Sequence, residues 1–558
     1  MNNITTKPLI VQGDRTLLLE VNHPGYNEAR HAISPFTELV KSPEYIHTYR
    51  MSSLSLWNAA SLGWKAEKVV SILREYSQYA IPVHIEKEII STMERFGKLE
   101  LARQDGELVL RAEDGQVIEQ LLSYPSIAQL VTRCIDSHSV VIPQGIRGMI
   151  KQTLMKLGYP VRDVAGYTDG EELKLSLYET PNFSLRTYQK EAVDAFYDKG
   201  SVSGGNGIIV LPCGAGKTIV GIETMVRFGM ATLILTSNTT SVKQWREEII
   251  SKTTLTGDQV GIYTGEAKEV GPVTVSTYQM ITHRSNADVP FPHLSLFHER
   301  NWGLIIYDEV HLLPAPVFRM TADIQAKRRL GLTATLVRED GRAEDVFSLI
   351  GPKKYELPWR MLEQQGWIAT AECTEIRVPM PEKVQRLYIE SGERQKFRIA
   401  SENPAKTDVV RKVLTDHSDE QVLIIGQYVA QLEAIAQELK VPVITGITPH
   451  DEREKLYRMF RSKELKVLVV SRVANFAVDL PDAAVAIQIS GTFGSRQEEA
   501  QRLGRILRPK KGENIARFYS LVSSDSKEEQ YALKRQRFLV EQGYRYHLQI
   551  AEKPSRKI

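Results

Sequence analysis

The sequence predicts an α/β protein with two parallel-sheet lobes that follow an N-terminal region of mixed α and β structure. Short, continuously apolar runs alternate with helical segments in two separate sets, near residues 207–332 and near residues 422–521. Continuous apolar strands between helices are typical of parallel sheets that are covered on both faces. Before residue 125, apolar residues follow helical spacing and then a period of two, which predicts a different architecture there.

Composition limits the classes of protein to consider. The chain has 558 residues, which at roughly 150 residues per domain predicts three to four domains. A hydrophobic fraction of 42% and a charged fraction of 25% are those of a globular protein, not of a disordered chain. The net charge of +3 excludes a uniformly basic nucleic-acid coat protein, so any nucleic-acid contact has to come from local patches.

The cysteines indicate a reducing compartment. Cys134, Cys213 and Cys373 are scattered and include no Cys-x-x-Cys pair. This excludes a disulfide framework, a four-cysteine iron–sulfur cluster and a Cys-only zinc site. Because the sequence contains no apolar run of about 18 residues and no signal-peptide core, we expect a cytoplasmic protein without a membrane span.

Residues 1–125 are predicted to form an N-terminal accessory domain. Apolar residues between Leu54 and Phe96 follow helical spacing, and strands are then expected at residues 99–102, 107–110 and 116–118, joined by Asp-Gly turns. Helices followed by a hairpin predict a winged-helix-like unit, a fold that binds either DNA or protein. Residues 126–180 are expected to form a small mixed α/β segment that contacts DNA.

The two lobes are expected at residues 181–352 and 353–558. Their strands are predicted from the apolar runs. In the first lobe these are residues 207–211, 232–236, 273–276, 303–307 and 329–332, and in the second lobe residues 422–425, 441–444, 467–470, 485–489 and 518–521.

The sharpest local pattern is a glycine-rich segment between an apolar strand and a helix. Its residues are Leu211-Pro212-Cys213-Gly214-Ala215-Gly216-Lys217-Thr218. Glycines let backbone N–H groups approach phosphate oxygens, and the N-terminus of the following helix favours negative charge. Lys217 is expected to reach the β- and γ-phosphates of a nucleotide and Thr218 to ligate Mg²⁺. Leu211 stands where the usual pattern begins with glycine, so a simple glycine-rich turn is the alternative.

Two adjacent acids follow another apolar strand. Asp308 is expected to hold Mg²⁺ through water, and Glu309 to polarise the attacking water. His311 is expected to link this site to the next lobe. Taken alone, the segment could equally be an acidic helix cap after a buried strand, but its position after Lys217 favours the nucleotide site.

A third polar group lies near the end of the second lobe. Arg505 and Arg508 are three residues apart and therefore share one face of a helix. A guanidinium from a second lobe can stabilise the charge of a transferring phosphoryl group. The alternative is a solvated basic helix.

Together these patterns resemble the motor of superfamily-two helicases. The resemblance is carried by Gly214-x-Gly216-Lys217-Thr218, Asp308-Glu309-Val310-His311, Thr333-Ala334-Thr335 and Gln501-x-x-Gly504-Arg505-x-x-Arg508. It implies two RecA-like lobes that use ATP and Mg²⁺, with Ala215 inside the phosphate loop. It also implies further roles: adenine recognition by Arg186 and Gln189, catalysis by Gln501, and coupling of hydrolysis to lobe movement by Thr333, Thr335 and Asp479.

A narrower resemblance is to XPB-type DNA-repair helicases of prokaryotes. Arg338-Glu339-Asp340 is similar to the Arg-Glu-Asp element of that family, and residues 479–482, 534–544 and 8–20 also look XPB-like. The sequence departs from the family pattern at Ala474-Asn475, where the family tends to have Gly-Asp. The resemblance implies an ATP-dependent DNA helicase or translocase with 3′→5′ polarity that opens duplex DNA in nucleotide excision repair, in the cytoplasm and associated with the nucleoid.

The family also carries a thumb-like insertion, which is expected here at about residues 380–405. Arg394, Lys396 and Phe397 lie in it and mix basic and aromatic side chains, which suits phosphate contact and base stacking. Together with Arg338, Glu339 and Asp340, they are the expected DNA contacts. The alternative for this segment is an exposed amphipathic helix.

Two other functions remain open from the sequence. An RNA helicase would carry similar motor motifs, because a preference for the 2′-OH cannot be read from them. An ATP-gated scaffold that recruits a nuclease without unwinding DNA is the other. The expected partners are single-stranded/duplex DNA junctions and a nuclease or repair protein, with no membrane partner. The oligomeric state is open.

Overall fold

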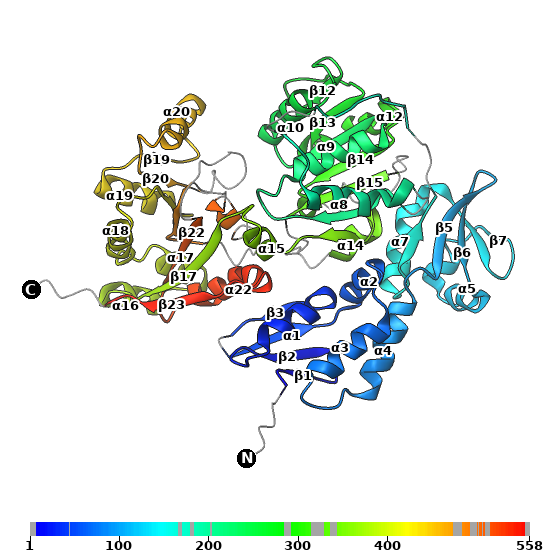
Figure 1. The fold of residues 1–558 in the computed structure, drawn as a ribbon, viewed down its shortest axis with the longest axis horizontal. Helices are drawn as coiled ribbons and strands as arrows, with labels where there is room; N and C mark the ends of the chain where they lie inside the picture. The colour runs from blue at the N-terminus through cyan, green and yellow to red at the C-terminus, as the bar shows by residue number, and fades with distance from the viewer. Residues whose placement is uncertain are drawn as a thin grey trace, which may run out of the picture. The chain divides into compact units, whose positions relative to one another are not determined.

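The computed structural model describes most of the chain. The described residues are 7–43, 45–165, 170–178, 183–200, 204–283, 292–313, 328–334, 343–471, 483–491, 499, 502–504, 506–507 and 514–552. The chain divides into two compact units (Figure 1). The first consists of Met1–Val40, Glu44–Leu211 and Gly216–Leu357, and the second of Lys41–Pro43, Pro212–Ala215 and Pro358–Ile558.

A four-stranded sheet begins the first unit, and its β1–β2 and β2–β4 pairings are antiparallel. Its strand order is β1-β2-β4-β3, and four helices accompany it. The strands are β1 (Leu9–Val11), β2 (Thr16–Glu20), β3 (Glu38–Lys41) and β4 (Ile46–Arg50); the helices are α1 (Tyr26–Ile33), α2 (Ser53–Ser61), α3 (Ala66–Tyr76) and α4 (Val83–Glu94).

The predicted hairpin after Gly97 is confirmed. Strands β5 (Leu99–Gln104) and β6 (Glu107–Ala112) pair antiparallel around Asp105 and Gly106, whose φ angles of 50° and 85° are those of a tight hairpin turn. The third expected strand, at residues 116–118, is wrong, because this segment lies in helix α5 (Gly115–Leu122). The Asp114 side chain accepts a hydrogen bond from the Gln116 backbone N–H at 2.9 Å and thereby begins a helix.

The winged-helix-like prediction is also wrong. The hairpin belongs to a five-stranded sheet of order β7-β8-β6-β5-β9, in which β9 lies parallel to β5. One buried apolar cluster runs from Leu99 to Ala165, so the boundary expected after residue 125 falls inside a single sheet and core. The remaining elements are α6 (Pro125–Ala128), β7 (Arg133–Cys134), β8 (Ser139–Ile142), α7 (Arg147–Lys156) and β9 (Val161–Asp163).

The first lobe contains the predicted parallel sheet. Its order is β12-β13-β11-β14-β15-β10-β16, and all of its pairings are parallel. The five expected strands are confirmed, within one or two residues, as β10 (Asn206–Val210), β11 (Thr232–Thr236), β13 (Val273–Thr277), β14 (Leu304–Asp308) and β15 (Arg328–Thr333). Two strands escaped prediction, β12 (Val260–Tyr263) and β16 (Lys353–Glu356). The latter lies past the expected boundary at residue 352.

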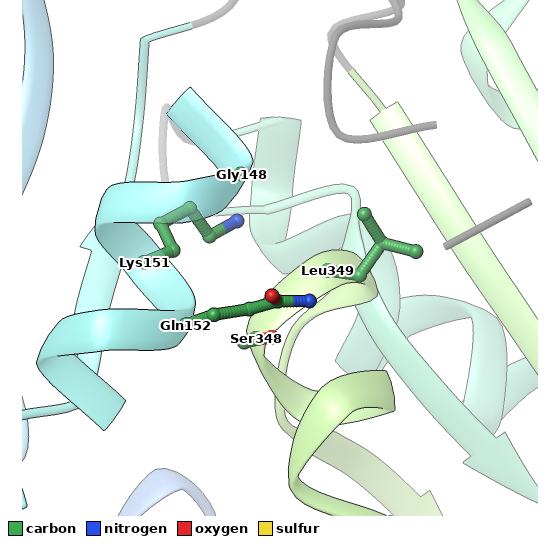
Figure 2. Close-up of a pocket in the computed structure, with 5 residues that line it drawn as sticks. All are labelled: Gly148, Lys151, Gln152, Ser348 and Leu349. Carbon is green, nitrogen blue, oxygen red and sulfur yellow. The ribbon is translucent and has the colours of Figure 1, made fainter. Parts of the chain in front are cut away.

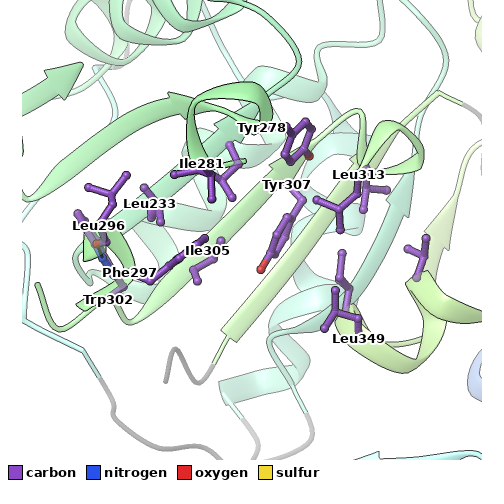
Figure 3. Close-up of a cluster of buried hydrophobic side chains, with 14 of the residues drawn as sticks. Leu233, Tyr278, Ile281, Leu296, Phe297, Trp302, Ile305, Tyr307, Leu313 and Leu349 are labelled. Atoms are coloured by element: carbon purple, nitrogen blue, oxygen red, sulfur yellow. Dashed lines mark hydrogen bonds between the residues drawn. The ribbon is translucent and has the colours of Figure 1, made fainter. Parts of the chain in front are cut away.

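Helices α8 (Thr187–Tyr197), α9 (Lys217–Phe228), α10 (Thr239–Lys252) and α14 (Ala343–Ile350) pack with this sheet. A cluster of buried side chains joins β11 and β14 to the segments that follow the strands. Figure 3 shows its aromatic and aliphatic members, with Tyr278 and Tyr307 near one another and Trp302 and Phe297 farther along the sheet. Burial of these apolar side chains stabilises the sheet and keeps the strand ends beside one another.

The second unit contains the other predicted parallel sheet, of order β19-β20-β18-β21-β22-β17-β23. The expected strands are confirmed as β18 (Val422–Ile425), β19 (Val443–Ile444), β20 (Val467–Val470), β21 (Val485–Gln488) and β22 (Ile515–Ser523). Strands β17 (Thr370–Val378) and β23 (Tyr546–Ile550) were not predicted. The helices are α15 (Trp359–Gln364), α16 (Glu382–Glu390), α17 (Glu393–Ser401), α18 (Lys406–Asp416), α19 (Val429–Leu439), α20 (His450–Arg461) and α22 (Lys527–Glu541). Among the described residues, no helix is both long and apolar enough to span a membrane.

A buried charge cluster joins the accessory region to the first lobe. The Asp163 carboxylate, at the end of β9, pairs with Arg147 at 2.5 Å and Lys151 at 2.9 Å, both on α7, and with Arg329 of β15 at 3.5 Å. None of these side chains is more than 8% exposed. Burial alone would raise the pKa of Asp163, but the three cations hold that pKa well below its usual range.

Lys151 also faces helix α14. Figure 2 shows Lys151 and Gln152 of α7 beside Ser348 and Leu349 of α14, around a pocket of about 10 Å³, which is close to the space one water molecule needs. Burial lowers the pKa of Lys151 to about 8, against the attraction of Asp163. The contact between α7 and α14 is therefore tightly packed. The buried cations beside it depend on the Asp163 carboxylate as their counter-charge.

We expect Asp163→Asn to destabilise the first unit by roughly 3–5 kcal/mol, because it leaves buried cations without their carboxylate. Denaturant unfolding, combined with hydrogen exchange of α7 and β15, measures the loss. Because the pKa of Asp163 is depressed, its contribution is present near neutral pH and is lost as the pH falls below the ordinary range of an aspartate. The variant should therefore also show a weaker loss of stability in acid.

Asp194→Asn is the matched control. Its carboxylate pairs with Arg227 but is 60% exposed, so its removal should cost no more than about 1 kcal/mol. An equal cost for the two substitutions would contradict a special role for the Asp163 cluster.

Candidate nucleotide-binding site

The predicted nucleotide-site residues of the first lobe meet at one edge of its sheet. Strands β10, β15 and β14 are neighbours, and all run in the same direction. Their carboxyl ends lead into the glycine-rich loop, Thr333 and the Asp308-Glu309 pair, respectively. This edge of an open parallel sheet is where ligands bind in α/β proteins.

The glycine-rich loop needs glycine on both sides of Ala215, and at Gly216 for a second reason as well. Gly214 and Gly216 both have a φ of 80°, in the left-handed region that other residues adopt at a cost. A Cβ on Gly216 would also lie 2.6 Å from Nε2 of Gln189, whereas a Cβ on Gly214 would meet no atom within 4 Å. Helix α9 begins immediately afterwards, at Lys217, so the turn directs the helix N-terminus toward the loop, where an anion is favoured.

Lys217 reaches across the sheet edge to Glu309. Its Nζ lies 3.3 Å from Glu309 Oε1, and both side chains are largely buried. Burial would raise the pKa of Glu309, but Lys217 and then His311 lower it overall, so this carboxylate is ionised. The backbone of Glu309 has a φ of 49°, a strained conformation for a side-chain-bearing residue that is often found at functional sites.

Asp308 differs from Glu309 in both partners and charge. Its Oδ2 accepts a hydrogen bond from Trp245 Nε1 at 2.9 Å, its Oδ1 accepts one from the Glu309 backbone N–H at 3.0 Å, and its carbonyl oxygen accepts one from the Tyr278 hydroxyl at 2.8 Å. Burial and the neighbouring Glu309 carboxylate raise the pKa of Asp308 to about 6. The two adjacent acids are therefore held in different electrostatic states, as is typical of carboxylates with separate roles.

This environment fits a divalent cation. A buried carboxylate whose ionisation is disfavoured gains most from a nearby positive charge. Mg²⁺ is usually held by one or two carboxylates together with water and substrate phosphates. Among the residues that the structure describes, no group of three or more His, Cys, Asp or Glu side chains could hold a metal. Thr218, in the first turn of α9, is the other predicted Mg²⁺ ligand.

His311 and Thr333 connect the loops of the site. His311 Nδ1 and Thr333 Oγ1 are 2.7 Å apart, and both residues are buried. His311 Nδ1 also lies 3.6 Å from Glu309 Oε2, and the Thr333 carbonyl oxygen accepts a hydrogen bond from the Leu211 backbone N–H at 3.0 Å. Glu309, Thr333 and the start of the glycine-rich loop are thus joined by direct contacts, which is the arrangement a coupling role requires.

The predicted adenine-recognition residues lie beside the loop. Gln189 is buried, and its Oε1 accepts a hydrogen bond from the Arg186 backbone N–H at 2.9 Å. Arg186 Nη1 donates to the Tyr188 hydroxyl at 2.9 Å. Gln189 therefore holds the start of α8 while its amide nitrogen occupies the space next to Gly216.

Several predicted site residues lie outside the described residues. They are Thr335, Arg338, Glu339, Asp340, Asp479, Gln501, Arg505 and Arg508, together with Ala474-Asn475. Arg502, which follows Gln501, is described: only 1% of it is exposed, and its Nη1 donates to Gln488 Oε1. Arg502 is therefore anchored in the core of the second lobe.

The thumb-like insertion is a pair of helices, α16 and α17. Arg394 is exposed on α17, and Lys396 Nζ pairs with Glu393 at 3.0 Å. The expectation that Phe397 stacks on bases is wrong for this structure. Its side chain is 2% exposed, and its ring packs edge-on against Tyr531 at a centroid distance of 4.9 Å. Phe397 instead fixes α17 to α22.

Two residues that position Asp308 were not identified from the sequence. Trp245 shares helical spacing with Val242 and Ile249, a pattern that indicates a core residue and gives no sign of its indole hydrogen bond. Tyr278 follows β13, and nothing in the sequence relates it to a strand that ends thirty residues later. Both contacts arise only when the sheet places β13, β11 and β14 side by side.

Family models match three parts of the chain. "ERCC3/RAD25/XPB C-terminal helicase" matches residues 362–556, "Type III restriction enzyme, res subunit" matches residues 182–338, and "Helicase conserved C-terminal domain" matches residues 9–136. Together these matches reach the accessory region and both lobes.

Curated relatives are similar over nearly the full length. "DNA 3′-5′ helicase XPB" of Mycobacterium tuberculosis is 52% identical, covering 98% of this chain and 99% of the relative. The protein of the same name from Kineococcus radiotolerans is 51% identical, covering 98% and 97%. "General transcription and DNA repair factor IIH helicase/translocase subunit XPB" of Enterocytozoon bieneusi is 32% identical, covering 97% and 92%.

We expect Trp245→Phe to move the acid limb of the pH profile for ATP hydrolysis to higher pH. The substitution removes a hydrogen bond that lowers the pKa of Asp308, so that pKa rises further above about 6. A protonated Asp308 would lose its predicted role of holding Mg²⁺, so we expect activity to fall as the pH drops through this pKa, and a higher pKa to move that fall to higher pH. The measurement is kcat/KM between pH 5 and 8.

Trp302→Phe is the matched control. Trp302 Nε1 donates to the Leu296 carbonyl oxygen at 2.9 Å and lies before β14, at the opposite end of that strand from Asp308. Its removal should leave the acid limb in place. An unshifted limb in Trp245→Phe, or the same shift in both variants, would contradict the assigned role.

Proposed function

The chain belongs to the XPB family of DNA helicases, and from this premise we propose that it is an ATP-dependent DNA helicase that moves 3′→5′ along a strand. The observation that carries the proposal is the meeting of the phosphate loop, Lys217, Asp308 and Glu309 at one sheet edge, in a chain 52% identical to a DNA 3′-5′ helicase. The first feature supports ATP hydrolysis, and the second supports DNA as the track.

In the proposed reaction, the ATP phosphates bind at Gly214, Ala215, Gly216, Lys217 and Thr218. Lys217 exchanges its carboxylate partner for the β- and γ-phosphates, which leaves Glu309 free to accept a proton from the attacking water. Mg²⁺, when bound, would neutralise phosphate charge, and Thr218 and Asp308 are the residues that would hold it. Arg186 and Gln189 would recognise the adenine.

The second lobe would complete the motor. We assign Gln501, Arg505 and Arg508 to stabilising the charge on the transferring phosphoryl group, in line with the order of the family's motifs. Thr333, Thr335 and Asp479 would couple hydrolysis to lobe movement. The direct contacts of His311 with Thr333 and of Thr333 with Leu211 support this role for the first-lobe members.

DNA contact is assigned to the α16–α17 hairpin and to Arg338, Glu339 and Asp340. Arg394 and Lys396 are suited to phosphate contact, whereas the buried Phe397 supports the hairpin from within. Opening of duplex DNA in excision repair is the proposed process, because one relative is named as a DNA repair factor subunit. A nuclease or repair protein would make the incision, and we place the activity in the cytoplasm at the nucleoid.

A strand-displacement assay tests the function. With ATP and Mg²⁺, the protein should release the labelled strand from a duplex with a 3′ single-stranded tail and leave a 5′-tailed duplex intact. Glu309→Gln should bind ATP but displace no strand, because it lacks the base that accepts the proton. Glu266→Gln, which changes an exposed carboxylate of the same lobe, should behave like the wild type. Displacement of the 5′-tailed duplex alone, or equal activity on RNA, would refute the proposal.

The hairpin assignment makes a separate prediction. Arg394→Ala should weaken DNA binding and lower the salt dependence of the binding constant by about one phosphate contact, with ATP hydrolysis in the absence of DNA unchanged. Binding is measured by fluorescence anisotropy at several salt concentrations. Arg458→Ala, on the exposed side of α20, is the control and should keep the wild-type slope. Equal losses in the two variants would remove the hairpin from the DNA contact.

A further inference from the structure

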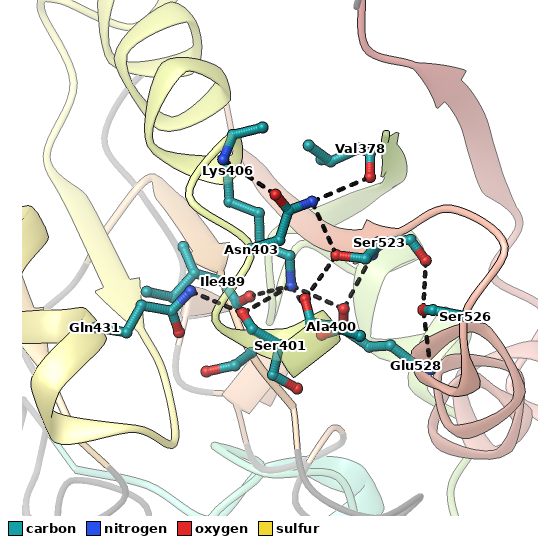
Figure 4. Close-up of polar contacts among 12 residues, drawn as sticks. Val378, Ala400, Ser401, Asn403, Lys406, Gln431, Ile489, Ser523, Ser526 and Glu528 are labelled. Atoms are coloured by element: carbon teal, nitrogen blue, oxygen red, sulfur yellow. Dashed lines mark hydrogen bonds and ion pairs between the residues drawn. The ribbon is translucent and has the colours of Figure 1, made fainter. Parts of the chain in front are cut away.

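A lysine without solvent exposure lies at the base of the α16–α17 hairpin. Lys406 begins α18, and both it and its partner Glu528 of α22 are 0% exposed (Figure 4). The ammonium group donates to Glu528 Oε1 at 2.9 Å, to Glu528 Oε2 at 2.8 Å, to the Ile489 carbonyl oxygen at 2.8 Å and to the Ser401 carbonyl oxygen at 3.2 Å. One side chain therefore contacts the end of α17, the residue after β21, and α22.

Neighbouring polar groups fix the same base. Asn403 Nδ2 donates to the Val378 carbonyl oxygen at 3.3 Å and to Ser523 Oγ at 3.1 Å, which ties the α17–α18 turn to the ends of β17 and β22. Ser523 Oγ donates to the Ala400 carbonyl oxygen at 2.6 Å, and the Ser523 backbone N–H donates to Glu528 Oε2 at 2.9 Å. The hairpin thus joins the lobe through directional hydrogen bonds (Figure 4).

Helix α22 makes a second buried contact with the segment that follows β21. Arg535 lies seven residues after Glu528, on the same face of the helix. Its Nε is 3.5 Å from Glu499 Oε2, which accepts a hydrogen bond from Gln488 Nε2 at 2.9 Å. Gln488 in turn accepts one from Arg502. None of these four side chains is more than 1% exposed. This second contact anchors Glu499 and Arg502, which precede Arg505 and Arg508 in the sequence.

Stability alone does not explain a buried ion pair of this kind. Removing two charges from water costs free energy that their attraction often fails to recover, and replacement by well-packed apolar residues is frequently neutral or stabilising. What apolar residues cannot reproduce is direction: the three N–H donors of the ammonium group, shared among four acceptor oxygens, define where the backbone at Ser401 and Ile489 lies relative to α22. The pair therefore specifies geometry.

We propose that the Lys406–Glu528 pair is the positioning centre through which the α16–α17 hairpin is coupled to the segment carrying Arg505 and Arg508. Through it, DNA held by the hairpin accelerates ATP hydrolysis. The inference rests on the proposed function, because it assumes a DNA-stimulated ATPase. Lys406 and Glu528 are positioning residues: being fully buried, they act only through the backbone that they hold.

The test replaces the pair by apolar residues. Lys406→Met alone should lower Tm strongly, because it leaves a buried carboxylate without its cation, and adding Glu528→Leu should restore most of the loss. In the double variant, ATP hydrolysis without DNA and the KM for ATP should match the wild type. The stimulation of hydrolysis by single-stranded DNA should fall roughly tenfold, within the range typical of coupling between sites.

A second ion pair in the same lobe provides the matched control. Arg411 of α18 pairs with Glu438 of α19, and both side chains are more than 40% exposed. Arg411→Met with Glu438→Leu should keep the full DNA stimulation. If it loses stimulation as the Lys406/Glu528 variant does, the effect is not specific to the buried pair and the inference is overturned.

The outcomes separate the inference from the function on which it rests. Wild-type protein without DNA-stimulated hydrolysis refutes the proposed function itself. A stimulated wild type together with a stable, fully stimulated double variant overturns only the positioning role, as does an equal fall of both rates. If the double variant does not fold, Glu528→Gln decides, because the amide keeps the shape but removes the charge: reduced stimulation supports the inference, and unchanged stimulation overturns it.

Discussion

Two consecutive carboxylates buried at the end of one strand are the constraint on which the rest of the first lobe depends. Asp308 and Glu309 repel each other, and the ammonium group of Lys217 pairs with Glu309. Keeping both acids in place requires the strained backbone at Glu309, the indole hydrogen bond from Trp245 and the ordered strands beneath them. Two adjacent acids with pKa values shifted in opposite directions support the proposal that a cation and a polyphosphate bind here together.

Both units place buried charges where structural elements from different parts of the chain meet. Asp163 ties the accessory sheet to β15, and Lys406 ties the hairpin to α22. Apolar packing alone tolerates small displacements, whereas a buried charge must keep its partners in a defined geometry because an unpaired ion in the interior is costly. The protein therefore uses ion pairs where orientation matters and apolar clusters for the remaining cohesion.

The sequence was most informative where one physical rule dominates. Buried parallel strands are continuously apolar, and for that reason all ten strands proposed for the two lobes were found. Strand β16, Lys353–Glu356, was missed because its residues are polar and partly exposed at the edge of the sheet. The strand predicted at residues 116–118 was wrong because the Asp114 carboxylate caps a helix there. This cap outweighs the preference of the apolar residues for a strand.

Residues of the candidate site differ in the same way in how far the sequence alone could identify them. The phosphate loop and the acid pair were predictable because their chemistry depends on residues adjacent in sequence. Trp245 and Tyr278 were not, because their roles depend on strand order. Base stacking was predicted for Phe397 because the segment mixes basic and aromatic residues, and only its packing against Tyr531 shows that it is a core residue.

The space beside Gly216 has a consequence for how the protein tolerates mutation. The amide nitrogen of Gln189 fills that space. The amide oxygen of the same side chain accepts a hydrogen bond from the Arg186 backbone N–H and so caps the start of α8. A methyl group added at Gly216 would therefore displace the side chain that caps a helix beginning 29 residues earlier in the chain, and so would disturb the proposed phosphate and adenine subsites together. A substitution designed for one of these proposed subsites therefore has to be chosen together with the residue at the other, because Gln189 contacts both.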